Sequence, residues 1–161
     1  MTNNVRPIPE GYHSVTPAIT CKNAGSAIDF YKRAFGAQEV MRMSGPNGAV
    51  MHAEIKIGDS IIFIGDEWPG MSSAPNPQAT PSSYLCIYSD NVDKLFNQAV
   101  AAGCKSAMPL TNQFWGDRYG KVSDPFGHHW GLSQHVEDVP HEEMERRSKE
   151  WMATMAKSAT Q

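Results

Sequence analysis

The sequence contains few cysteines, no excess of positive charge and no long apolar run, and each absence excludes a class of protein. Its three cysteines, Cys21, Cys86 and Cys104, lie far apart, so they form neither a disulfide framework nor a paired-cysteine metal knuckle. Lysine and arginine (14) do not outnumber aspartate and glutamate (17), which argues against a nucleic-acid partner. No apolar segment approaches the roughly 20 residues that span a bilayer, and the N-terminus lacks an apolar signal segment. We therefore expect a cytoplasmic protein with reduced thiols and no membrane partner.

What is present is the composition of one globular domain, with 161 residues of which 40% are hydrophobic and 19% charged. Within this length, the succession of a strand, a polar cap, a helix and a glycine occurs once in each half. The offset between the two cap residues, Asn23 and Asp90, equals the offset between the two closing glycines, Gly36 and Gly103. This shared offset indicates that one module has been duplicated.

Each of the two helices is followed by three segments with the periodicity of strands, so each half has the order βαβββ. These segments are residues 38–43, 49–57 and 60–64 in the first half, and residues 104–109, 117–123 and 128–135 in the second. We predict an α+β fold in which two tandem βαβββ modules, residues 11–64 and 83–135, form a curved sheet around a shared cleft, with the helices outside. Residues 65–82 are rich in proline, serine and glycine and are predicted to form a linker. Over residues 138–157, acidic residues followed by basic ones predict a C-terminal helix.

Alternation along the strands indicates which side chains face the cleft, because neighbouring residues point to opposite faces. In residues 49–57, Met51 and Ile55 belong to an apolar set that should lie beneath the helix, whereas His52 and Glu54 should face the cleft. The same parity in the second module directs a set of aromatic, polar and charged side chains into the cleft: Tyr84, Cys86, Tyr88, Trp115, Asp117, Tyr119 and Lys121.

The tandem βαβββ order, the helix AIDFYKRAFGA and the turn DPFGHHW together resemble the vicinal oxygen chelate superfamily, which includes glyoxalase I, bleomycin-resistance proteins and extradiol dioxygenases. The resemblance covers about residues 11–135. In its metal-dependent members, a His or Glu from the first and last strands of each module binds the metal, and these positions fall here on Thr16, Phe63, Tyr84 and Gly131. None of the four is a good ligand for a divalent ion. We therefore expect no cofactor at the usual position of the superfamily.

A displaced metal site is the alternative. His52, Glu54 and His129 offer two imidazoles and a carboxylate, the composition of a facial triad for a divalent metal such as Fe, Zn, Mn or Ni. In that case the protein would be a lyase, isomerase or dioxygenase with His52 and Glu54 as catalytic residues, Glu54 serving as ligand or general base. Without a metal, the same side chains only hydrogen-bond within a polar cleft.

The function that the resemblance favours is the metal-independent binding of a small organic molecule in an aromatic cleft, as in the bleomycin-resistance branch. The expected ligand-binding residues supply stacking surfaces and one orienting carboxylate: Phe63, Tyr84, Tyr88, Trp115, Asp117 and Tyr119. A third hypothesis is a structural or regulatory module without a ligand. Sheet edges and the apolar side of the C-terminal helix predict a homodimer, with modules paired either within one chain or across two.

Overall fold

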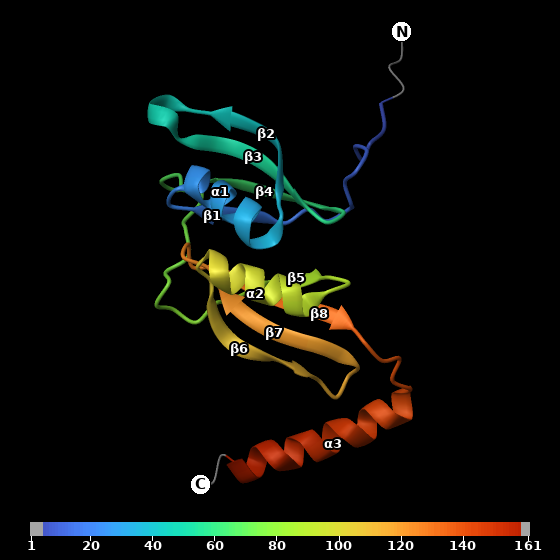
Figure 1. Ribbon diagram of the computed structural model, residues 1–161. Helices are drawn as coiled ribbons and strands as arrows, with labels where there is room; N and C mark the ends of the chain where they lie inside the picture. The colour runs from blue at the N-terminus through green and yellow to red at the C-terminus, as the bar shows by residue number, and fades with distance from the viewer. Residues whose placement is uncertain (1–4, 159–161) are drawn as a thin grey trace.

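The computed structural model describes residues 5–158, which form two four-stranded sheets and three α-helices (Figure 1). The first module contains β1 (Ala18–Cys21), α1 (Ala24–Phe35), β2 (Gln38–Ser44), a short 3-10 helix η1 (Pro46–Gly48), β3 (Val50–Ile57) and β4 (Ser60–Asp66). The second contains β5 (Leu85–Tyr88), α2 (Val92–Ala102), β6 (Lys105–Asn112), β7 (Asp117–Ser123) and β8 (His129–His135), and α3 (His141–Ser158) follows. The predicted βαβββ order of both halves and the C-terminal helix are confirmed. Among the described residues, no helix has the length and apolar character needed to cross a membrane.

The two sheets have the same topology, which supports the duplication inferred from the spacing of caps and glycines. Their strand orders are β1-β4-β3-β2 and β5-β8-β7-β6. In each sheet the first strand pairs in parallel with the last, and the remaining pairs are antiparallel. Each sheet is complete within its own module, so the modules do not share one continuous sheet.

The helix ends follow from local capping chemistry. The Asn23 side chain accepts a hydrogen bond from the Ser26 amide at 3.0 Å, and Gly36 ends α1 in the left-handed conformation with φ of +68°. In the second module the cap is Asn91, which accepts from the Lys94 amide at 3.0 Å, and not Asp90 as predicted. Asp90 lies one position too early for its side chain to reach the free amides of the first turn.

The helices lie between the two sheets, which corrects the expectation that they lie outside a shared cleft (Figure 1). Side chains on more than one side of α1 are buried, because α1 packs on its own sheet and also on the second module. Across this contact, the Trp130 ring lies 4.7 Å from that of Phe35 and 5.2 Å from that of Tyr31, and the Gln98 side chain donates to the Arg33 carbonyl at 2.9 Å. One core therefore joins both modules, and the open faces of the two sheets point away from each other.

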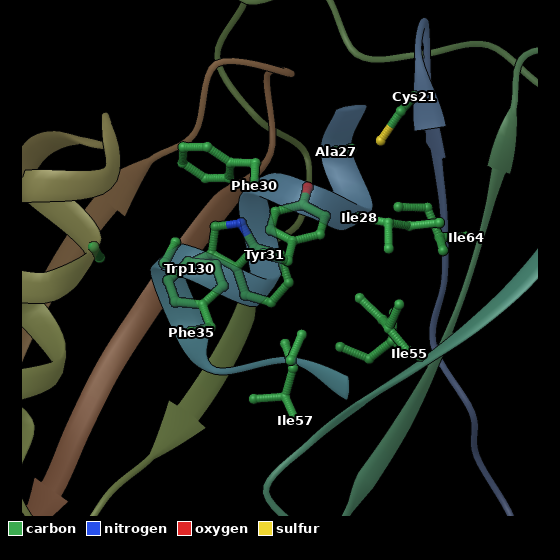
Figure 2. Packing of buried hydrophobic residues seen from close by; sticks show 14 of the residues in the cluster. Cys21, Ala27, Ile28, Phe30, Tyr31, Phe35, Ile55, Ile57, Ile64 and Trp130 are labelled. Carbon is green, nitrogen blue, oxygen red and sulfur yellow. The ribbon is translucent and has the colours of Figure 1, made fainter. Parts of the chain in front are cut away.

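Beneath α1, the predicted packing is largely confirmed. Ile28 and Ile55 are fully buried in the same cluster, on one side of the first sheet (Figure 2). Met51, also predicted to be buried, is 46% exposed, whereas Val50 is buried. The pairing of β2 with β3 shifts register between Met43 and Ser44, and this irregularity interrupts the alternation at Met51.

A buried carboxylate joins the two motifs on which the family resemblance was based. Asp124 Oδ2 accepts hydrogen bonds from the Tyr31 hydroxyl at 2.7 Å and from Trp130 Nε1 at 2.9 Å. Its other oxygen accepts from the amides of Phe126 and His128, both at 2.9 Å. The helix motif and the turn motif are therefore two halves of one inter-module contact.

Candidate functional site

The open face of the second sheet carries a pocket of about 610 Å³. Its walls come from all four strands of the sheet, from the loop before β7 and from α3. Five of the six residues predicted to bind a ligand line this pocket: Tyr84, Tyr88, Trp115, Asp117 and Tyr119. Cys86 and Lys121 line it as well, so the prediction that these side chains share one face is confirmed.

Local sequence explains why these side chains meet. Along β5, Leu85 and Ile87 pack against the core, so their neighbours must point to the open face. On β8, a Cβ atom at Gly131 would lie 2.9 Å from the Tyr119 ring and 3.2 Å from Cys86 Sγ. Glycine at this position therefore allows the Tyr119 ring to lie directly on β8.

A hydrogen-bonded carboxylate occupies one end of the pocket. Asp117 accepts from the hydroxyls of Tyr88 at 2.8 Å and Ser133 at 3.0 Å, and His135 Nδ1 lies 2.9 Å from its other oxygen. Burial acts to raise the pKa of Asp117, but hydrogen bonds from His135, Tyr88 and Ser133 outweigh it and hold the pKa below its usual value. Contacts of His135 with Asp138 and Asp117 raise the pKa of its imidazole. Asp117 therefore remains ionised and fixes the orientation of Tyr88.

The thiol in this pocket, that of Cys86, is not activated. Partial burial, together with the negative charge of Asp117, raises the pKa of Cys86, and Lys121 opposes this shift without cancelling it. A raised pKa keeps the side chain as the neutral thiol, which is the weak nucleophile. Cys86 therefore contributes a small apolar surface to the pocket.

The C-terminal helix supplies pocket residues that the sequence did not assign to the site. Trp151 and Met155 of α3 line the pocket, and the Trp151 ring lies 5.6 Å from that of Phe114. One contact of Arg147 ties the helix to the segment before it: its guanidinium lies 2.7 Å from a carboxylate oxygen of Glu137. Its second contact, 2.7 Å from an oxygen of Glu143, lies within α3. The apolar side of this helix was visible in the sequence, but nothing local indicated which surface it covers.

The predicted catalytic pair lies elsewhere, on the open face of the first sheet. Glu54 and Phe63 line a separate pocket of about 500 Å³ together with Thr16 and residues of the N-terminal arm. The Tyr12 hydroxyl donates to Glu54, and His52 Nε2 lies 3.3 Å from the other Glu54 oxygen. Tyr12 is a partner that strand parity could not reveal, because it precedes the first strand. Phe63, the sixth predicted ligand-binding residue, is thus separated within one chain from the other five.

The three residues of the alternative metal site do not come together within the chain. His129 lines a different hollow, beside Lys105 and Asp124, whereas His52 and Glu54 lie on the first sheet. β3 and β8 belong to different sheets with both helices between them, so strand parity alone could not bring these residues together. Within residues 5–158, no group of three His, Cys, Asp or Glu side chains is placed to hold one ion.

The family's usual metal position also lacks suitable donors. Thr16 and Phe63 line the pocket on the first sheet, and Tyr84 lines the aromatic pocket on the second sheet. Together these side chains offer two hydroxyl groups and no imidazole or carboxylate. At the fourth position, the ring of Tyr119 fills the space that a side chain on Gly131 would need. The residues present do not fit a divalent ion at this position.

The tandem βαβββ modules are the fold expected from the family resemblance, and comparison with a family model identifies the same superfamily. Residues 13–132 match the Glyoxalase/Bleomycin resistance protein/Dioxygenase superfamily, and the chain belongs to this superfamily, which confirms the resemblance seen in the sequence. The α3 helix lies outside the matched residues.

Individual relatives extend this comparison. The chain is 37% identical over 149 residues to the uncharacterized protein Mb0911c of Mycobacterium bovis, which covers 90% of this chain and 94% of that protein. Its fold is similar to TioX from Micromonospora sp. ML1, with a TM-score of 0.61, 22% identity, and coverage of 80% of this chain and 100% of TioX. It is also similar to a bleomycin-binding protein complexed with bleomycin, with a TM-score of 0.56, 23% identity, and coverage of 76% and 98%. These structural likenesses show the fold.

Proposed function

We propose that the protein binds a small aromatic organic molecule in the pocket between the second sheet and α3. The observation that carries this proposal is the gathering of aromatic side chains from separate elements around a single volume of about 610 Å³: Tyr84, Tyr88, Trp115, Tyr119 and Trp151. Volumes of this size are typical of ligand pockets, and such rings offer large stacking surfaces. The similarity to a bleomycin-binding protein supports the proposal at the level of the fold.

The polar groups of the pocket support binding more than catalysis. Asp117 already accepts hydrogen bonds from Tyr88 and Ser133 and contacts His135, so it is occupied in fixing the wall. The thiol of Cys86 is neutral. A general base or nucleophile would need a free, activated group within reach of the ligand, and the pocket lining offers none in that form.

The test is titration with N-phenyl-1-naphthylamine, a neutral probe whose fluorescence rises in apolar surroundings. We expect saturable binding of one probe per chain. Trp115→Ala should weaken it about tenfold, since one aromatic contact contributes on the order of 1 kcal/mol or more. Trp68→Ala removes a tryptophan of the linker that does not line the pocket and should leave the affinity unchanged. Absence of saturable binding, or equal affinities of the two variants, would contradict the proposal.

We also propose that no metal ion occupies the superfamily's usual position. The donor set at Thr16, Phe63, Tyr84 and Gly131 supports this, because an ion there would lose more hydration than these groups return. Elemental analysis after dialysis should find less than one ion per chain. Stoichiometric metal that persists in both His52→Ala and Glu54→Ala would contradict the proposal.

Finally, we propose that two chains form a homodimer in which the open face of the first sheet meets the open face of its partner's second sheet. The placement of both helices between the sheets supports this arrangement, because it leaves two open faces on opposite sides of one chain. In such a dimer, His52, Glu54 and Phe63 of one subunit would lie near the aromatic pocket of the other.

A further inference from the structure

One end of the aromatic pocket carries a positive charge that is not paired with a carboxylate. Lys121 Nζ lies 4.1 Å from the centroid of the Tyr84 ring, a cation–π contact at the pocket wall. Among residues 5–158, no ion pair joins Lys121 to an acidic side chain, although Lys32, Arg42, Arg118, Arg146 and Arg147 all have such partners. The ring holds the ammonium group in place and leaves N–H donors available to a further partner.

A second donor lies at the same end. Lys121 is the β7 residue opposite Gly131 of β8. A Cβ atom at Gly131 would lie 3.0 Å from the hydroxyl oxygen of Tyr119, so this hydroxyl reaches the strand position that faces Lys121. The Tyr119 oxygen is buried, and the neighbouring Tyr84 side chain acts on it, but no hydrogen bond of standard geometry to the described residues satisfies it. A buried hydroxyl without a well-formed hydrogen bond favours a ligand that accepts one from it.

The negative charge of the pocket lies at the opposite end and is compensated. Asp117 is four residues from Lys121 along β7, roughly 13 Å at the usual rise of a strand. Its charge is balanced by the contact with His135 and by two hydroxyl donors. Beside Lys121, burial raises the pKa of Tyr119 and partial burial raises that of Cys86, so both remain neutral. The end of the pocket near Lys121 therefore has a positive electrostatic character.

On the basis of the proposed function, we propose that the ligand is a planar aromatic anion, stacked on the aromatic wall, with its carboxylate, sulfonate or phosphate group bound by Lys121 and Tyr119. The aromatic surface recognises the flat part of the molecule. The ammonium and the phenol recognise its charged group by hydrogen bonds that are both charge-assisted, because the acceptor is an anion. A neutral aromatic molecule would use only the first of these two contributions.

Two probes separate the contributions, because 1-anilinonaphthalene-8-sulfonate and N-phenyl-1-naphthylamine share their rings and differ by one sulfonate. We expect Lys121→Gln to weaken binding of the sulfonate probe about tenfold, the scale of one charge-assisted hydrogen bond, and to leave the neutral probe within about twofold. Tyr119→Phe should act in the same direction with a smaller effect, and Lys121→Arg should retain binding of the sulfonate.

The matched control is Lys105→Gln, which removes one positive charge from β6 outside this pocket. It should leave both affinities unchanged, so that a general effect of net charge is separated from recognition by Lys121. Normal binding of the neutral probe shows that a variant is folded. If Lys121→Gln binds both probes as the wild type does, the anion inference is wrong and the proposed function stands. If neither probe binds the wild type, both are wrong.

Discussion

Asp124 shows how one residue can hold two modules together. It is buried, and its two oxygens accept four hydrogen bonds, from side chains of both modules and from the amides of its own turn. A buried charge is costly unless it is fully hydrogen-bonded, and here each carboxylate oxygen of Asp124 accepts two hydrogen bonds. Both oxygens must therefore be acceptors for this contact between the modules to form.

Asp124→Asn should lower the free energy of unfolding by about 2–4 kcal/mol. In either orientation, the amide would place an NH₂ group against N–H donors, on one side Trp130 Nε1 and on the other the amides of Phe126 and His128. Urea denaturation measures the change. Asp59→Asn, in the exposed turn after β3 where the side chain accepts a hydrogen bond from the Ser60 hydroxyl, should change the stability by less than about 0.5 kcal/mol. Equal stabilities of the two variants would contradict this role of Asp124.

His135 and Asp117 form a contact whose strength depends on pH. The pKa of His135 is raised, so its contribution to stability is complete below the ordinary value of 6.5 and is lost as the pH rises through the raised value. The pKa of Asp117 is lowered, so its contribution is lost as the pH falls through that lowered value. The charged pair therefore exists in the window between the two.

Asp117→Asn should lower the pKa of His135. Asp138→Asn, made separately, should lower this pKa by more, because Asp138 is the larger cause of the shift. NMR titration of the His135 ring protons measures both effects, with the resonance assigned by its loss in His135→Gln. An unchanged titration curve in Asp117→Asn would show that the 2.9 Å contact does not exist in solution.

At the scale of the element, α3 converts an open sheet face into a pocket. Two of its exposed apolar residues, Trp151 and Met155, line the pocket, whereas Met152 between them does not. Residues four apart on a helix share a face, which explains this selection. A helix outside the superfamily match thus shapes the site of this particular chain.

Trp151→Ala should weaken binding of N-phenyl-1-naphthylamine about fivefold to tenfold, because a stacking surface is lost. Met152→Ala removes an apolar side chain of comparable exposure, 54% against 46%, from the same helix and should have no effect. Fluorescence titration of both variants provides the comparison. Loss of affinity in both would indicate that the integrity of the helix matters and not the Trp151 ring.

The whole molecule has an open sheet face on each of two opposite sides. The N-terminal arm lines a pocket on the first face, and α3 lines one on the second. Each face still exposes large side chains that an isolated chain would leave in water, such as Tyr84 at 50% exposure and, opposite His52, Met43 at 51%. Pairing of two chains would cover these surfaces.

Sedimentation velocity at micromolar concentration should therefore show a particle of two chains. Phe63→Lys places a charge on the open face of the first sheet and should shift the equilibrium towards the monomer. Met71→Lys places the same charge on the exposed linker, where Met71 is 88% exposed, and should leave the dimer intact. A wild-type monomer, or a dimer that tolerates Phe63→Lys, would contradict the proposed arrangement.

The sequence by itself determined the order of elements, the duplication, three of the four ends of α1 and α2, and most of the side chains on each strand face. These features depend on local physics: side-chain caps act within four residues, and strand parity repeats every two. The capping by Asn23 and the grouping of Tyr84 with Tyr88 could therefore be predicted. Where parity failed, at Met51, the cause was a register shift with the neighbouring strand.

Only the tertiary structure decided how the faces are combined. The separation of Phe63, His52 and Glu54 from the aromatic pocket follows from the burial of both helices between the sheets. That arrangement depends on contacts such as the hydrogen bond from Tyr31 to Asp124, which are 93 positions apart. The closure of the pocket by α3 likewise depends on Trp151 meeting Phe114. Contacts over such separations are set by the shapes of packed surfaces, which no local pattern of residues carries.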